Sequence, residues 1–168
     1  MAISKSNRVG TVNNLEVGGT HDLLMVKVEG DFPEGKVSFG FYDVPMKITG
    51  LQKVVQTFLK VLLTTKGSDV IYPDRGSFFP EMTVGANQLV DDNALLSDLS
   101  DAIKDATGQT RSILNVNSSD ITSALDRVEI LGLDRISEGV MIYLQVITLA
   151  GELAAISVPF PEFGLDGN

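Results

Sequence analysis

The chain has 168 residues, of which 43% are hydrophobic and 21% charged, and it contains no cysteine. A domain of this length buries roughly 70% of its unfolded surface. The lack of cysteine excludes disulfides and thiolate metal sites and is compatible with a reducing cytoplasm. No apolar run reaches the ~18 residues of a membrane helix, and the N-terminus lacks the apolar core of a signal peptide. We therefore expect no membrane insertion.

The net charge of −9 is unevenly distributed along the chain. Residues 1–66 contain eight Lys and Arg against six Asp and Glu, a balance of +2, whereas residues 67–168 contain five against sixteen, a balance of −11. The acidic C-terminal part makes nucleic acid a poor partner and favours oriented docking on a basic surface. A role in solubility alone would explain the same charge.

The N-terminal third predicts an arm followed by a β-hairpin. Residues 1–21 are polar, contain three glycines and show no sustained hydrophobic period, which predicts an arm that a partner orders. Apolar and polar side chains alternate in residues 24–29 and again in residues 37–42, with turn residues between them. Residues 22–47 therefore predict a hairpin that ends at Pro45.

A first amphipathic helix follows the hairpin. Thr49 and Gln52 have the spacing of a capping box at its start, and Gly67 is expected to stop it. Apolar residues recur on one helical face, which should pack on a sheet: Leu51, Val55, Phe58, Leu59 and Leu62.

A second amphipathic helix is predicted to begin at Asp91 or Asp92, where a carboxylate favours the positive end of the helix dipole. It either ends at Gly108 or kinks there before residues 111–114. Its apolar side is formed by Leu95, Leu99, Ala102, Ile103 and Ala106.

The C-terminal part predicts antiparallel strands. Residues 128–133 form the first strand and residues 134–139 a loop, which places Arg135 in that loop. The stretch Val140–Leu149 is so apolar that both of its faces should be covered, and a turn leads to a last strand over residues 153–158. Pro159 and Pro161 are expected to stop this strand.

Together these elements predict an α+β fold, with two amphipathic helices packed on a small, mainly antiparallel sheet and an N-terminal β-hairpin extension. We expect a flexible arm (1–21), one domain (22–158, with the hairpin in 22–47 and the core in 48–158) and a tail (159–168).

Residues suited to catalysis are sparse. The single histidine, His21, lies in the predicted arm without a cysteine or an acidic pair, and the chain has neither a G-x-S-x-G motif nor a P-loop. Glu129, Asp134 and Glu138 lie near one predicted hairpin and would give a hydrolase its two carboxylates, but a solvated strand edge carries the same residues. We expect no catalytic residue and no cofactor.

Three carboxylates on the second helix raise the question of a metal. Asp98, Asp101 and Asp105 follow an i, i+3, i+7 spacing, which suits either a hard cation or a solvated helix face. Solvated helix faces are much commoner, so we expect no metal.

Residues 62–79, LLTTKGSDVIYPDRGSFF, form a glycine-containing segment after the first helix. This segment resembles the sheath-initiator family of contractile-tailed bacteriophages, with Ser68-Asp69 where the family has a glutamate and Arg75 where it has an aromatic residue. The family's Glu-Pro-Arg triplet is represented only by Arg127, and the order of elements over residues 48–158 also fits. The matching positions are Leu63, Thr64, Lys66, Gly67, Pro73, Asp74, Gly76 and Ser77.

The resemblance implies a non-enzymatic virion protein of the tail baseplate, assembled in the host cytoplasm. It implies a baseplate wedge subunit, in six copies, that starts polymerisation of the contractile sheath and contacts other wedge proteins, the tail tube and sheath proteins. Two alternatives stay open: a baseplate or tail adaptor without sheath contact, and a small wall-degrading hydrolase that uses Glu129 or Glu138. The expected interaction residues are Lys66, Gly67, Asp74, Arg75, Gly76, Arg127, Leu153, Ile156 and Val158.

The expected mechanism is β-augmentation, in which the edge over residues 153–158 accepts a strand from a sheath subunit. Proline at Ile156 or Ser157 is expected to delete an edge N–H group. Arg127 is expected to be at least partly buried and hydrogen-bonded to a carboxylate or to backbone carbonyls. With the loop over residues 66–77, it is expected to hold the chain on neighbouring wedge proteins.

Overall fold

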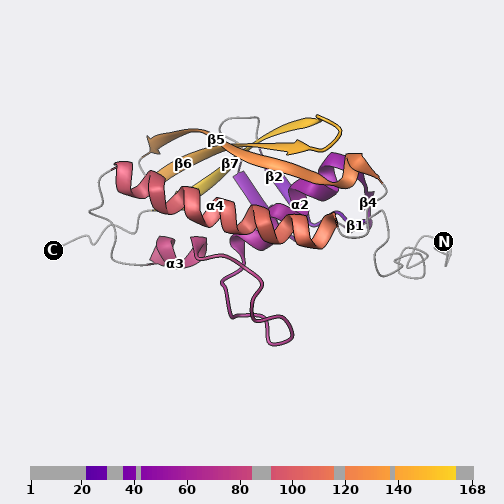
Figure 1. Cartoon of the computed structure of the whole chain (residues 1–168), viewed down its shortest axis with the longest axis horizontal. Helices are drawn as coiled ribbons and strands as arrows, with labels where there is room; N and C mark the ends of the chain where they lie inside the picture. Colours follow the sequence, from indigo (N-terminus) through magenta and orange to yellow (C-terminus); the bar gives the residue numbers. More distant parts are fainter. Residues whose placement is uncertain are drawn as a thin grey trace.

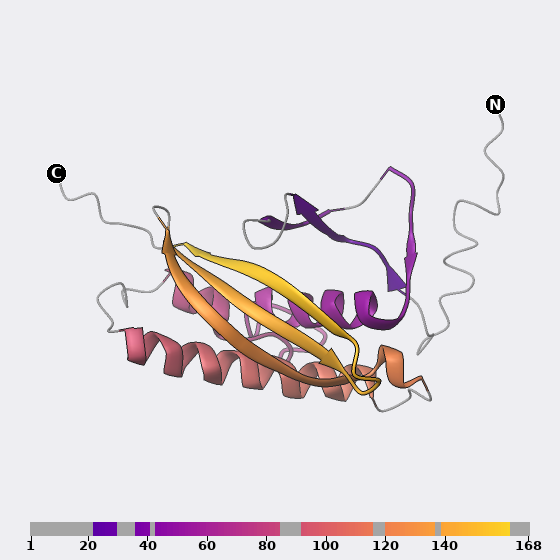
Figure 2. The same cartoon turned by 90° about the horizontal axis from the view of Figure 1, so that it is seen from above.

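The computed structural model describes residues 22–29, 36–40, 43–84, 92–115, 120–136 and 139–161. Two long helices, α2 (Gly50–Leu63) and α4 (Asp92–Leu114), pack on a three-stranded antiparallel sheet. The sheet has the order β5 (Leu125–Ile136), β6 (Gly139–Thr148) and β7 (Leu153–Pro161) and lies across the helices (Figures 1 and 2). The predicted α+β class is confirmed. The predicted arm and residues 162–168 of the predicted tail lie outside the described residues.

Two short pairings precede the helices. Strand β2 (Val26–Glu29) pairs antiparallel with β3 (Lys36–Phe39), which confirms the predicted hairpin, although its turn lies outside the described residues. Strand β1 (Asp22–Leu23) pairs with β4 (Lys47–Ile48). This second pairing was not predicted, because two residues are too few to show a period of two.

Helix α2 is the centre of the core. It lies against β6 and β7 on one side and against α4 on another, so its buried stripe is wider than the predicted one. Phe58, Leu59 and Leu62 are buried as predicted, whereas Leu51 and Val55 are only half-buried. The full set of buried side chains on this helix is Val54, Gln56, Thr57, Phe58, Leu59, Val61 and Leu62.

The start of α2 is capped by a distant segment, so the predicted capping box is wrong. The Thr49 side chain makes no capping hydrogen bond. Instead, the Gly50 N–H group donates to Ser123 Oγ at 2.9 Å, and the Ser123 hydroxyl in turn donates to Asp120 Oδ2 at 2.8 Å. An orphan donor at the helix N-terminus is thus satisfied from the short 3₁₀ helix η2 (Ile121–Ser123).

Helix α2 also ends earlier than predicted. Its last residue is Leu63, and Thr64 already has an extended backbone, so Gly67 does not stop the helix. One of the terminal carbonyl groups, that of Leu62, accepts a 2.6 Å hydrogen bond from the buried Ser77 hydroxyl. A side chain fifteen residues along the chain therefore completes this end.

Helix α4 begins at Asp92, and Leu99, Ala102, Ile103 and Ala106 are buried as predicted. It neither ends nor breaks at Gly108 but continues to Leu114. The short helix α3 (Phe79–Val84) was not predicted because six residues give little periodic signal. The Phe79 ring meets Phe160 of β7 edge-to-face at 5.6 Å.

Two of the three sheet strands, β5 and β7, are longer than predicted. Strand β5 runs to Ile136, so Asp134 and Arg135 belong to the strand and not to a loop. Strand β6 is almost wholly buried, as its apolar sequence predicted. Strand β7 continues through Pro159 instead of stopping before it, and its last residue is Pro161.

We expect Phe58→Ala to lower the free energy of unfolding by about 3–5 kcal/mol, because the ring is fully buried and its removal leaves a cavity between helices and sheet. Chemical denaturation would measure the loss. Ile113→Ala is the control, because Ile113 lies on α4 and is 40% exposed. An unfolding midpoint equal to that of the wild type for Phe58→Ala would contradict the packing described here.

Candidate interaction sites

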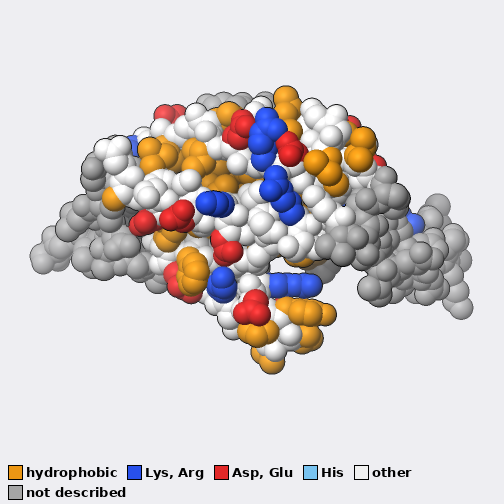
Figure 3. Space-filling model, in the orientation of Figure 1, with side chains coloured by type: hydrophobic (Ala, Val, Ile, Leu, Met, Phe, Trp, Pro, Cys, Tyr) orange, Lys and Arg blue, Asp and Glu red, His pale blue; other side chains and the backbone are white. Residues whose placement is uncertain are grey.

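Residues 64–78, called here the 64–78 loop, project from the helices on the side away from the sheet (Figure 1). Hydrophobic side chains gather at the end of the projection (Figure 3). These are Val70, Ile71 and Tyr72, called here the apolar tip, which are 95%, 78% and 51% exposed. Most large apolar side chains of a soluble domain avoid such exposure, so the tip marks a candidate contact surface.

Backbone hydrogen bonds close the base of the 64–78 loop. The Ser77 N–H group donates to Thr64 O at 2.8 Å, and the Lys66 N–H group donates to Ser77 O at 3.1 Å. Further out, the Gly67 N–H group donates to Pro73 O at 2.9 Å. The two limbs of the loop are therefore tied together along their length.

Gly76 and Gln109 lock the loop onto α4. The Gly76 N–H group donates to Gln109 Oε1 at 3.0 Å, and Gln109 Nε2 donates to Gly76 O at 2.7 Å. Gly76 has a φ of +103°, as its turn position predicted, and a Cβ atom there would lie 2.5 Å from Thr64 O. Only glycine satisfies both conditions. Gln109 was not identified from the sequence, because one glutamine in a helix gives no signal.

The apolar tip has internal order of its own. Asp69 Oδ1 accepts hydrogen bonds from the N–H groups of Ile71 at 2.9 Å and Tyr72 at 3.1 Å, and these bonds hold the pKa of Asp69 below its usual value. The Arg75 guanidinium stacks on the Tyr72 ring, 3.9 Å from its centroid. No carboxylate of the described residues lies within ion-pair distance of Arg75.

A hollow of about 460 Å³ lies between the loop base, α3 and α4. Lys66 lies at its side, with Nζ 3.5 Å from Asp105 Oδ2 and 5.1 Å from the centroid of the Phe78 ring. Within the described ranges, no group of three His, Cys, Asp or Glu side chains is placed to hold a metal ion. The lining residues are Lys66, Phe78, Met82, Asp98, Asp101, Ala102 and Asp105.

Strand β7 is an edge of the three-stranded sheet, as predicted. The Thr148 N–H group donates to Glu152 O at 3.0 Å, so Thr148 and Glu152 are a hydrogen-bonded residue pair. In two antiparallel strands, hydrogen-bonded and non-hydrogen-bonded residue pairs alternate along the strands. With Leu153 opposite Ile147, the N–H groups of Leu153 and Ala155 point away from β6. Pro159 and Pro161 fall in the same outward series, which explains why β7 tolerates both.

Two expectations for β7 need correction. The Ile156 N–H group belongs to the inward series, so proline there would break the pairing with β6 and not the outer edge. Val158 is 1% exposed and packs in the core, so its side chain is closed to a partner. Leu153, by contrast, is 56% exposed.

Arg127 is an exposed residue of β5, so the expected burial is wrong, whereas the expected hydrogen bond to a carboxylate is confirmed. Its side chain is 53% exposed and pairs with Asp126 and, at 2.6 Å, with Glu129. The hydrogen bonds that Arg127 donates to Glu129 and then to Asp126 raise the pKa of Arg127, but such exposed pairs contribute little to stability. Arg127 and Leu153 both lie opposite Ile147, so the register brings them to the same end of the sheet.

The carboxylates of the hydrolase alternative are engaged on the exposed surface of β5. Glu129 pairs with Arg127, and Asp134 Oδ2 accepts a 3.0 Å hydrogen bond from the Tyr143 hydroxyl. Glu138 lies outside the described residues. No observation on the described residues favours a pair of catalytic carboxylates here.

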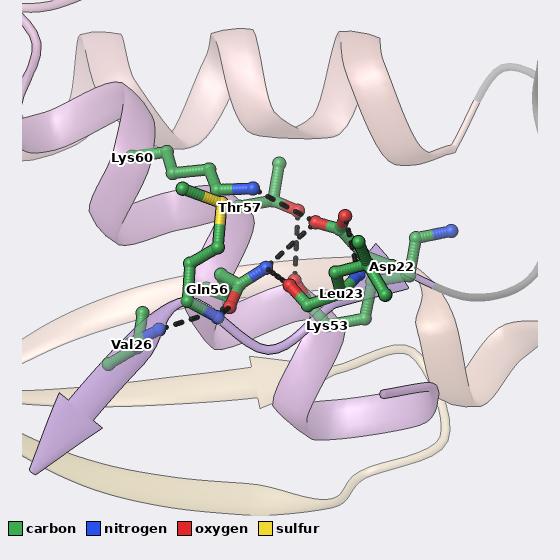
Figure 4. A network of polar contacts seen from close by, with 8 residues as sticks. Asp22, Leu23, Val26, Lys53, Gln56, Thr57 and Lys60 are labelled. Carbon is green, nitrogen blue, oxygen red and sulfur yellow. Dashed lines mark hydrogen bonds and ion pairs between the residues drawn. The ribbon is translucent and has the colours of Figure 1, made fainter. Parts of the chain in front are cut away.

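A buried glutamine on α2 anchors the N-terminal segment (Figure 4). Gln56 is 1% exposed, and its Oε1 atom accepts hydrogen bonds from the N–H groups of Met25 at 2.6 Å and Val26 at 3.2 Å. Its Nε2 atom donates to Leu23 O at 2.7 Å and to Asp22 Oδ2 at 2.8 Å. All the hydrogen-bonding capacity of the amide is therefore used, as a buried polar group requires.

The comparisons with protein-family models, curated proteins and solved structures find no match to this chain. The resemblance to sheath initiators therefore depends on the residues of the 64–78 loop and on the order of elements. None of the helices in the described ranges has both the length and the apolar composition needed to cross a bilayer.

We expect Gly76→Ala to destabilise the 64–78 loop far more than Gly67→Ala. Both glycines have positive φ, which costs an alanine about 1–2 kcal/mol. An added Cβ meets Thr64 O only at Gly76, and at Gly67 it meets nothing within 4 Å. Limited proteolysis within residues 65–76 would show faster cleavage for Gly76→Ala. Equal cleavage of the two variants would contradict the close approach at Gly76.

Asp22 should make the stability of the N-terminal segment depend on acid. Burial raises the pKa of Asp22, but the hydrogen bond and charge of Lys60, with the Leu23 N–H group, outweigh it and lower the pKa. The stabilisation is therefore complete above the unfolded pKa of ~3.9 and is lost as pH falls through the lower folded value. Thermal midpoints of wild type and Asp22→Asn should converge in acid. A difference that is constant from neutral to acidic pH would contradict the ion pair.

Proposed function

We propose that this protein is a structural subunit of a contractile-tail baseplate wedge, and that the β7 edge starts sheath polymerisation by accepting a strand. The observation that carries the proposal is the outward-facing backbone at Leu153 and Ala155, at an exposed end of the sheet. The resemblance of residues 62–79 to sheath initiators supports the same function. An unpaired strand edge is a template for β-augmentation, in which main-chain hydrogen bonds provide affinity.

The accessible part of the β7 edge is its first half. Leu153 and Ala155 are exposed, whereas Ser157 and Phe160 are only 4% and 6% exposed. Strand β3 of the N-terminal hairpin lies beside β7, on its side away from β6 (Figure 2). An incoming strand would therefore pair first with residues 153–155, close to the β6–β7 turn.

The opposite edge of the sheet is less suited to this role. At the start of β5, the Leu125 N–H group donates to Asn115 Oδ1 at 3.1 Å, and Asn115 Nδ2 donates to Leu125 O at 3.0 Å. The backbone of Leu125 is therefore already satisfied by a side chain from the end of α4. Helix α4 also packs along β5, so the β7 edge is the better candidate.

The adaptor function is the second candidate. It is favoured by the 64–78 loop, which projects away from the sheet and would contact a different partner from the one at β7 (Figure 1). An adaptor would need this loop but not an open β7 edge, so a variant of the edge distinguishes the two functions.

Ala155→Pro tests the role of the edge. It removes an outward N–H group and leaves the β6–β7 pairing in place, so baseplates containing the variant should form but should carry no normal sheath. Electron microscopy of tails assembled with the full-length variant would measure sheath length. Normal sheaths on such baseplates would favour the adaptor.

Two controls accompany this experiment. Ala155→Ser keeps the N–H group and should support normal sheaths. Ala154→Pro removes an inward N–H group that pairs with Val146, so it should lower the thermal midpoint of the isolated protein, whereas Ala155→Pro should leave it nearly unchanged.

A further inference from the structure

We propose that the apolar tip of the 64–78 loop is a preformed knob that inserts into an apolar pocket on a second protein, with a carboxylate of that protein pairing with Arg75. The partner is neither the sheath nor a second copy of this chain. This inference rests on the proposed function in one respect only: it assigns the knob to a partner different from the one at the β7 edge.

The knob is ordered before any partner binds. The two limbs of the loop are hydrogen-bonded to each other, Gln109 holds Gly76 through two hydrogen bonds, and Asp69 fixes the backbone of Ile71 and Tyr72. The loop loses its conformational entropy when the protein folds, so little more is lost when a partner binds. An ordered loop that exposes its apolar side chains is therefore suited to insertion into a partner.

Arg75 indicates the chemistry of the partner. Its guanidinium lies over the Tyr72 ring at 3.9 Å, and no carboxylate of the described residues lies within ion-pair distance of it, although it interacts with the charge of Asp69 on the same loop. Because Arg75 is exposed, its guanidinium is accessible for a bidentate contact with a carboxylate. Tyrosine and arginine are also enriched among the residues that contribute most to protein interfaces. The pocket on the partner should therefore have Asp or Glu at its rim.

The charge around the knob argues against a lipid surface. Asp69 and Asp74 flank the tip on the same loop, and Asp98 and Asp101 line the hollow at its base. Anionic headgroups attract clusters of Lys and Arg, whereas this surface offers only Arg75 and Lys66 among several carboxylates. A protein pocket that receives a few side chains fits this surface better.

The same charges argue against a second copy. The hollow beside the loop has apolar residues and carboxylates, as the pocket of a partner should, together with Lys66, which pairs with Asp105. Because knob and hollow are adjacent in one chain, two copies would meet through a two-fold contact that brings their acidic α4 faces together. Like charges placed opposite each other across an interface cost several kcal/mol. A different protein is therefore the better occupant.

Site-specific photo-cross-linking tests the knob. The full-length chain carrying an aryl-ketone side chain at position 71 is made in the cells that naturally produce it, and the cross-linked peptide is identified by mass spectrometry. The control carries the same group at position 113, an exposed apolar position on α4. We expect position 71 to label one protein other than the sheath, next to an Asp or Glu, and position 113 not to label it.

Charge reversal then tests Arg75. Arg75→Glu should lower the yield at position 71 at least about tenfold, because it places two carboxylates together in a desolvated contact. Changing the labelled partner carboxylate to Lys should restore the yield with Arg75→Glu. Val70→Ser combined with Tyr72→Ser should also lower it, while the thermal midpoint stays unchanged because both side chains are exposed.

Several results would contradict the proposal that the apolar tip inserts into a partner. They are equal labelling from positions 71 and 113, a label on the sheath or on a second copy, an unchanged yield with Arg75→Glu, and co-sedimentation with phosphatidylcholine or phosphatidylserine vesicles that the double serine variant abolishes. Ala155→Pro separates the two proposals. It should leave the label from position 71 intact, so a failure of sheath initiation and a failure of the knob are distinguishable.

Discussion

The fold depends on the burial of α2 between the sheet and α4. Its apolar stripe packs on the sheet and on α4, and its remaining polar groups are satisfied by segments far away in the sequence. Ser123 caps its start, Ser77 bonds a carbonyl at its end, and Gln56 holds the N-terminal segment against its side. One helix thus organises the loop, the N-terminal strands and the core, because each of them completes a hydrogen bond that α2 cannot complete alone.

The sequence predicted those elements whose signal is local. The period of α4 and the continuous apolar run of β6 were read correctly, because burial of one face or of both faces leaves a pattern over ten or more residues. The ends of α2 were read wrongly. Thr49 has the spacing of a capping residue, but Ser123 occupies that role from seventy-three residues away. A local motif cannot show that a distant hydroxyl will take its place.

The candidate sites divide in the same way. Gly76 was identified from its turn sequence, because only glycine tolerates the required φ, whereas its partner Gln109 gave no signal. Arg127 was expected to be partly buried, yet β5 places it on the exposed surface. The direction of the N–H groups in β7 was not predicted from the sequence either, because it depends on the hydrogen bond that closes the turn between Thr148 and Glu152.

The surfaces of the two proposed contacts are both anchored on the central helices. The 64–78 loop is joined to α4 by a hydrogen bond from the Gln109 side chain and to α2 by a hydrogen bond from the Ser77 side chain. Its base is therefore fixed on both central helices. The β7 edge belongs to a sheet that packs through one face on the same two helices. A partner at the tip and a strand at the edge would therefore be joined through α2 and its core.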